Sequence, residues 1–167
     1  MNSLIELLSH PYLITNRVAE SVYQEEGAAI QQRLRSRIKG RHHFTVEDYQ
    51  AIRKEAINVS RQLDRIADKL DKKEQAGDKQ DWLLLMQHPW LNHKHILKQV
   101  GKKYGLSYYK IYDSLRDKVD RPQGFIGGLS KEYRRFASWI RQRLDEAKVE
   151  KKEYVFSVGR GGGSHRG

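Results

Sequence analysis

Side chains able to contact DNA bases are concentrated between residues 107 and 116. A lysine can donate hydrogen bonds to O6 and N7 of guanine, and hydroxyl groups can reach bases or phosphates. The candidates are Ser107, Tyr109, Lys110, Asp113, Ser114 and Arg116. Just before them, Lys98, Lys102 and Lys103 have the spacing of one outer helix face, where cations neutralise phosphates. This chemistry predicts binding of nucleic acid and no enzymatic activity.

A second basic segment, residues 27–46, has five Lys or Arg residues and no acidic residue. Glutamine can form a bidentate pair with adenine, and arginine binds phosphate. The candidates here are Gln31, Gln32, Arg33, Arg35, Ser36 and Arg37. We therefore predict a second nucleic-acid contact in the first half of the chain.

Two other constellations suggest different chemistry. His88, His93 and His95 lie close together, but no neighbouring carboxylate or Cys completes a ligand set, so we predict neither a metal site nor a cofactor. Arg37 and His42 have the R-x4-H spacing, which is similar to a pattern in an all-α family of metal-independent ribonucleases. That similarity implies an RNA-cleaving alternative, in which the two residues would act on phosphate.

The candidates at residues 107–116 need a helix that is presented outward. Gly101 is a small residue where two helices can cross closely, Gly105 suits a tight turn, and the apolar Leu106 and Ile111 follow. With this spacing, residues 95–116 resemble bacterial helix-turn-helix DNA-binding motifs. The resemblance implies a second helix that enters the major groove, with Ser107 as its N-cap. The expected inner faces are Ile96, Leu97 and Val100, then Ile111, Leu115 and Val119.

Charge is distributed unevenly along the 167 residues. Lys and Arg number 32 and Asp and Glu 21, which gives a net charge of +11. Residues 1–78 contribute +1 and residues 79–167 contribute +10. Only 38% of residues are hydrophobic and no apolar run approaches a membrane span, so we expect no membrane partner. With no Cys and no leader-like N-terminus, we expect a cytoplasmic, nucleoid-associated protein.

The chain contains an internal duplication with an offset of 78 residues. His10-Pro11-Tyr12-Leu13 matches His88-Pro89-Trp90-Leu91, and Gly27 matches Gly105. The first copy departs from the helix-turn-helix pattern because Tyr23 stands where the second has Gly101. Each copy predicts four helices, with Pro11 or Pro89 near a helix start.

The longest expected helix follows Thr45, with Glu47 and Asp48 in its first turn. Its apolar residues repeat at spacings of three and four: Tyr49, Ile52, Ala56, Val59, Leu63, Ile66 and Leu70. This heptad stripe predicts packing on a partner helix, within the chain or in a homodimer. In the second copy, Ser130 is the expected cap, followed by Tyr133, Ala137, Ile140 and Leu144.

The expected fold is all-α, with two tandem helix-turn-helix lobes joined by a long helix and a charged linker. Residues 1–75 form the first lobe, 76–80 the linker, 81–152 the second lobe, and 153–167 a flexible Gly/Arg tail. The favoured function is sequence-specific binding of double-stranded DNA, as a transcriptional regulator or an accessory factor of a phage, plasmid or mobile-element complex. The alternatives are an RNA-binding protein or ribonuclease, and a helical adaptor for a protein partner.

Overall fold

The computed structural model describes residues 2–77 and 81–161, and within these ranges the chain is all-α. Its only β pairing there is one isolated bridge. No helix in the described ranges is long and apolar enough to cross a membrane. The helices are α1 (Ser3–Leu8), α2 (Thr15–Tyr23), α3 (Ala28–Ile38), α4 (Val46–Ala76), α5 (Trp82–Leu85), α6 (His93–Lys103), α7 (Tyr108–Leu115) and α8 (Phe125–Gly161).

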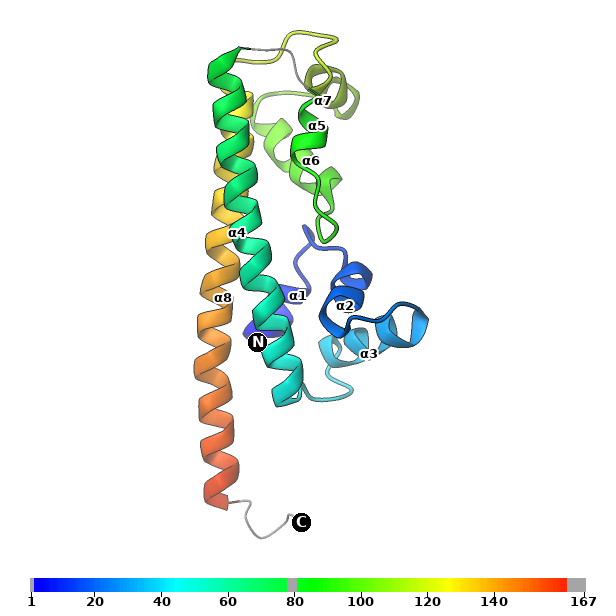
Figure 1. The fold of residues 1–167 in the computed structure, drawn as a ribbon, viewed down its shortest axis with the longest axis vertical. Coiled ribbons are helices and arrows are strands. Elements are labelled where there is room, and N and C mark those ends of the chain that lie inside the picture. The colour runs from blue at the N-terminus through cyan, green and yellow to red at the C-terminus, as the bar shows by residue number, and fades with distance from the viewer. Residues whose placement is uncertain (1, 78–80, 162–167) are drawn as a thin grey trace.

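The two long helices, α4 and α8, lie side by side and antiparallel (Figure 1). All seven apolar residues of the predicted heptad stripe are buried, as are the four of the second stripe. Ion pairs join the helices along their length: Arg134 contacts Asp68 and Asp71 at 2.8 and 2.6 Å, and Arg141 contacts Asp64 at 3.0 Å. The stripe is thus covered by α8 within one chain, which is the intramolecular packing that the sequence predicted.

Helix α8 begins earlier and ends later than the sequence suggested. It starts at Phe125, so Ser130 is not a cap; its hydroxyl donates to the carbonyl of Gly127 inside the helix, at 3.0 Å. The backbone remains helical to Gly161, where a flexible tail was expected from residue 153. Residues 162–167, and residues 78–80 of the expected linker, lie outside the described ranges.

The two halves repeat the same order of three short helices and one long helix. Their His-Pro loops meet in an antiparallel bridge between Leu13 and Leu91. The N–H of Ile14 donates to the carbonyl of Trp90 at 2.7 Å, and the N–H of Asn92 donates to the carbonyl of Tyr12 at 2.8 Å. Ile14 corresponds to Asn92 and Tyr12 to Trp90 in the duplication, so each bond is the counterpart of the other. The two loops are therefore related by an approximate two-fold axis.

The prolines lie in these loops and not at helix starts, which corrects the prediction for Pro11 and Pro89. In each loop the histidine ring fixes a turn: Nδ1 of His10 accepts from the N–H of Tyr12, and Nδ1 of His88 from the N–H of Trp90. Helices α2 and α6 begin only after the paired residues, at Thr15 and His93.

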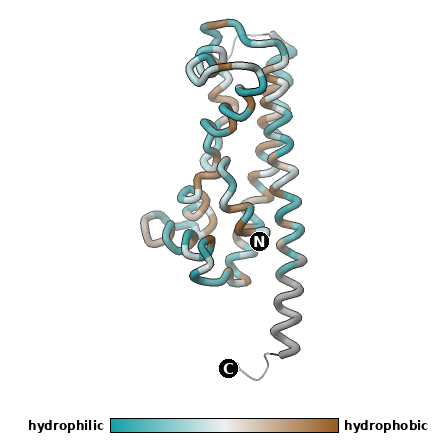
Figure 2. Tube along the Cα trace, turned by 180° about the vertical axis from the view of Figure 1, so that it is seen from behind, coloured by the Kyte–Doolittle hydropathy of each residue, from teal (hydrophilic) through white to brown (hydrophobic). Residues whose placement is uncertain are grey.

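The short helices lie on one side of the long pair (Figure 2), and their buried apolar residues join those of α4 and α8 in one core cluster. Although α1 belongs to the first half, it packs on α8 of the second half. Arg143 of α8 contacts Glu6 at 2.9 Å, and the hydroxyl of Tyr12 donates to Glu132. The long helices therefore form a core that both halves of the chain share.

Candidate nucleic-acid interface

The turn between α6 and α7 depends on two glycines. A Cβ atom at Gly101 would lie 2.5 Å from Cδ1 of Ile111, so only glycine allows the two helices to approach this closely. Gly105 has φ of +67°, in the left-handed region that favours glycine. The N–H of Leu106 then donates to the carbonyl of Gly101 at 3.0 Å and closes the turn. Both glycine roles follow the sequence prediction.

Apolar residues hold α6 and α7 against the core. Ile96, Leu97, Val100, Ile111 and Leu115 are all buried, as predicted. Val119 is 46% exposed, so its predicted place in the inner face is wrong. The physical reason is that α7 ends at Leu115, because the next residues turn the chain away through a left-handed Asp117 with φ of +56°.

The chain segments before and after α7 are each held by contacts with neighbouring elements. The hydroxyl of Tyr104 donates to the carbonyl of Gly124 at 2.9 Å, and its ring packs edge-on against Phe125 of α8. The guanidinium of Arg121 lies 5.0 Å from the ring centroid of Trp82 and donates to the carbonyl of Ser114 at 3.2 Å. The outer faces of α6 and α7 are thereby held by a rigid scaffold.

These outer faces carry an excess of positive charge. Seven Lys or Arg residues between positions 94 and 118 are exposed, and none forms an ion pair with another described residue. They are Lys94, Lys98, Lys102, Lys103, Lys110, Arg116 and Lys118. Lys94, Lys98 and Lys102 repeat every four residues, so they form one stripe along α6. Such a surface suits phosphates, which are bound by cations that no carboxylate occupies.

Most of the predicted base-contacting residues lie on the exposed face of α7. Ser107, Lys110 and Arg116 are exposed, and Tyr109 is 79% exposed. Ser107 occupies the N-cap position, but its side chain makes no capping hydrogen bond. Ser114 is wrong as a contact residue: it is 0% exposed, and its hydroxyl donates to the carbonyl of Ile111 at 2.8 Å.

In the first half, two of the three predicted arginines lie beside Asp48, which is 1% exposed. Nε of Arg37 lies 2.6 Å from this carboxylate, and the guanidinium of Arg33 lies 3.8 Å from it and 4.3 Å from the ring centroid of Tyr23. Burial would raise the pKa of Asp48, but hydrogen bonds from Thr45 and Tyr23, with the charge of Arg37, hold it below its ordinary value. Arg37 is therefore held by Asp48 within the fold, and its contact with DNA stays a prediction.

The remaining candidates of the first half offer a weaker surface. Arg35 donates to Asn16 at 2.8 Å, Ser36 is buried, Gln31 is partly buried and Gln32 is exposed. Under the 78-residue offset, Glu20 corresponds to Lys98 and Glu25 corresponds to Lys103. Helix α2 thus has one Arg and one Glu, whereas α6 has four lysines and no acidic residue, so the second half has the more positive surface.

Two of the clustered histidines hold the backbone in place. Nε2 of His93 accepts from the N–H of His88 at 3.1 Å, and its Nδ1 lies 3.2 Å from the hydroxyl of Tyr133. Burial, with the neighbouring His88, lowers the pKa of His93 to about 4. Within the described ranges, no group of three or more His, Cys, Asp or Glu side chains is arranged to hold a metal ion.

Arg37 and His42, which suggested ribonuclease chemistry, line one surface hollow of about 420 Å³ beside the start of α4. Much of its lining is apolar, including Leu4, Ile5 and Phe44. Nδ1 of His42 lies 3.2 Å from the hydroxyl of Ser36, while Arg37 is held by Asp48. Both polar groups are thus engaged within the fold.

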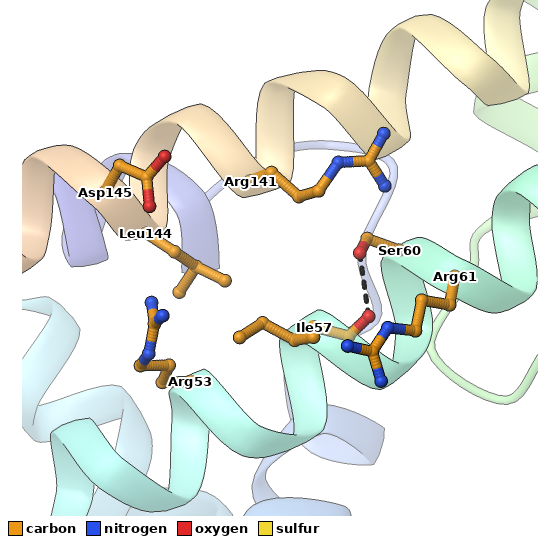
Figure 3. A pocket seen from close by; sticks show the side chains of 7 residues that line it. All are labelled: Arg53, Ile57, Ser60, Arg61, Arg141, Leu144 and Asp145. Atoms are coloured by element: carbon orange, nitrogen blue, oxygen red, sulfur yellow. Dashed lines mark hydrogen bonds between the residues drawn. The ribbon is translucent and has the colours of Figure 1, made fainter.

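A cavity of about 330 Å³ lies between α4 and α8, with the short helices behind it (Figure 3). Arg53 extends from α4 on one side and Asp145 lies across from it on α8. The hydroxyl of Ser60 donates a hydrogen bond to the carbonyl of Ile57 at 2.7 Å, and Arg141 forms an ion pair with Asp64. The cavity therefore presents mixed charges, unlike the exposed surface of α6 and α7.

Sequence reasoning missed Lys94, Tyr108 and Tyr112 as parts of this surface. The ammonium groups of Lys94 and Lys98 lie 5.6 and 5.2 Å from the ring centroid of Tyr108. The four-residue spacing of Lys94 and Lys98 was a usable signal. The tyrosines were harder to place, because aromatic residues at helical spacing are equally typical of a core.

The chain matches no protein-family model, no curated protein and no solved structure.

Proposed function

We propose that this protein binds double-stranded DNA through α6 and α7 and has no enzymatic activity. The supporting observation is the set of seven exposed Lys and Arg side chains, none of which forms an ion pair with a described carboxylate, on a closely packed helix-turn-helix pair. Duplex DNA carries a dense line of phosphates, and binding releases the counterions condensed on it. A fixed cationic surface on two rigid helices suits that ligand.

In the proposed arrangement, α7 enters the major groove with its N-terminal end toward the bases. Lys98, Lys102 and Lys103 bind the phosphates and fix the orientation of α7. Lys110 donates to guanine O6 and N7, while Ser107, Tyr109 and Arg116 contact neighbouring bases or phosphates. The biological role would be transcriptional regulation or organisation of a mobile-element nucleoprotein complex in the nucleoid.

Fluorescence polarisation with a random-sequence duplex over a series of salt concentrations tests the phosphate contacts. Lys102→Ala with Lys103→Ala should weaken binding and make the slope of log affinity against log salt shallower by about 1.8, about 0.9 for each lost contact. The matched control is Lys54→Ala with Lys148→Ala, which removes the same charge from exposed sites on α4 and α8, away from α7. Equal loss in both variants would show non-specific attraction to net charge.

Base reading is tested by selecting bound duplexes from a random pool, with the wild type and with Lys110→Ala. The variant should lose preference at one base pair, at a cost of about 1–3 kcal/mol for that base, and keep it elsewhere. A uniform loss across all sequences would mean that Lys110 touches only phosphate. Tighter binding to structured RNA than to duplex DNA, or RNA cleavage abolished by His42→Ala, would overturn the proposal in favour of the RNA alternative.

A further inference from the structure

Helix α7 carries three tyrosines that are not fully buried: Tyr108 and Tyr109 lie outside the core, and Tyr112 packs against its edge. The helix buries only Ile111, Ser114 and Leu115. Tyr109 is 79% exposed, and Tyr108 and Tyr112 are partly exposed. Exposed aromatic clusters commonly mark a binding surface, because exposure to water is unfavourable for the rings. Lysine contacts to phosphate do not account for this cluster.

The tyrosines are held in a fixed arrangement before any ligand binds. The Tyr108 ring is edge-on to Tyr109 at 5.6 Å and to Tyr112 at 5.2 Å between centroids. Lys94 and Lys98 place their ammonium groups beside Tyr108. The rings therefore lose little conformational freedom on binding, which favours a flat ligand.

The rings border a shallow hollow of about 470 Å³, whose remaining lining comes from Asp113 and Arg116. A carboxylate accepts hydrogen bonds from amino groups, and a guanidinium donates to carbonyl oxygens and ring nitrogens. Nucleobases carry both kinds of group on their edges and have flat faces that stack on aromatic side chains. The hollow thus combines stacking surfaces with a donor and an acceptor.

Resting on the proposed DNA binding, we infer that this hollow, the tyrosine hollow, takes up an unpaired base next to the duplex that α6 and α7 bind. Bases inside an intact duplex are covered on both faces by their neighbours, so only an unpaired base can stack on Tyr109. The preferred substrate is therefore duplex DNA with a bulged or otherwise unpaired nucleotide. Lys94 and Lys98 lie where they can bind its flanking phosphates.

The experiment compares a fully paired duplex with the same duplex carrying one bulged nucleotide, in polarisation assays at one salt concentration. The wild type should bind the bulged duplex about 10-fold more tightly, since stacking of one base on an aromatic side chain contributes about 1–3 kcal/mol. With 2-aminopurine as the bulged base, binding should also change its fluorescence. Tyr109→Leu should reduce the affinity ratio to about one, while Tyr109→Phe, which keeps the ring, should retain it.

The outcomes separate this inference from the proposed function. Equal affinity for both duplexes, with unchanged 2-aminopurine fluorescence, would overturn the inference and leave duplex binding standing. Failure to bind either duplex would overturn both. Tighter binding to the equivalent bulged RNA would assign the tyrosine hollow to RNA and overturn the DNA inference. A ratio that Tyr109→Leu leaves at 10-fold would show that the hollow is not the binding place.

Discussion

Replacing Gly101 by alanine would insert a methyl group into space that Ile111 already occupies. The added Cβ would lie 2.5 Å from Cδ1 and 3.0 Å from Cγ1 of Ile111, whereas carbon atoms in contact are normally about 3.5–4.0 Å apart. Relief requires α6 and α7 to move apart or the Ile111 side chain to leave its rotamer. Overpacking of this kind costs about 1–3 kcal/mol, and the higher helix propensity of alanine returns about 0.5–1 kcal/mol. We expect a net loss of about 1–2 kcal/mol.

The assay is urea unfolding followed by tryptophan fluorescence, in a double-mutant cycle with Ile111→Val. This second substitution removes the atom nearest to the new methyl group, and by itself it costs about 0.5–1.5 kcal/mol. The double variant should be more stable than the sum of the single losses predicts, by about 1 kcal/mol. The control is Gly127→Ala in α8, where a Cβ meets no atom within 4 Å, so alanine should stabilise the protein. An undiminished stability of Gly101→Ala, or simple additivity with Ile111→Val, would refute the close-crossing argument.

Three further substitutions test separate parts of the fold. Gly128→Ala should lower the free energy of unfolding by about 1 kcal/mol in urea titrations, because its Cβ would lie 2.6 Å from the hydroxyl of Tyr104; a neutral result would show that this ring moves freely. His93 has a pKa of about 4 in the folded chain and about 6.5 in the unfolded chain. Between these pH values only the unfolded chain binds the proton, so the free energy of unfolding should fall as the pH drops from 6.5 to about 4. His93→Gln should make that decline smaller, by about 2 kcal/mol after allowance for partial exposure, and an unchanged pH profile would exclude His93 as its source. Asp48→Asn should cost about 3–5 kcal/mol by thermal or urea unfolding, because it leaves buried guanidinium charge unpaired, and a loss below 1 kcal/mol would contradict the assigned ion pairs.

Regular spacing made the long helices predictable. The stripe from Tyr49 to Leu70 repeats at intervals that only a helix brings onto one face, so its burial followed from sequence alone. The spacing did not identify the helix on which this stripe packs. Helix α8 became that partner because the antiparallel arrangement brings Arg134 and Arg141 beside the aspartates of α4. Pairing over such a sequence distance is a tertiary property, which local patterns do not specify.

Errors in the predicted interface arose where a helix ended or a charge found a partner. Val119 was expected on the inner face, but the left-handed Asp117 ends the helix before it. Ser114 looked like a surface residue, but it lies three residues after Ile111 and next to Leu115, on the buried face of α7. The glycines of the turn were predictable, since each role depends on the absence of a side chain. The ion pair of Arg37 was not, because Asp48 is eleven residues away, beyond the loop that joins α3 to α4.

The duplication explains why the halves have different surfaces despite their shared topology. The offset of 78 residues sets Tyr23, Arg33, Arg37 and Asp48 of the first half against Gly101, Ile111, Leu115 and Ile126 of the second. In the first half these positions form an ion-pair cluster around a buried carboxylate, and in the second they are buried and apolar. Because Ile111 and Leu115 fill the core without charge, the second half needs no cation at these positions. Its lysines are free on the outer face, which makes α6 and α7 the natural place for an anionic ligand.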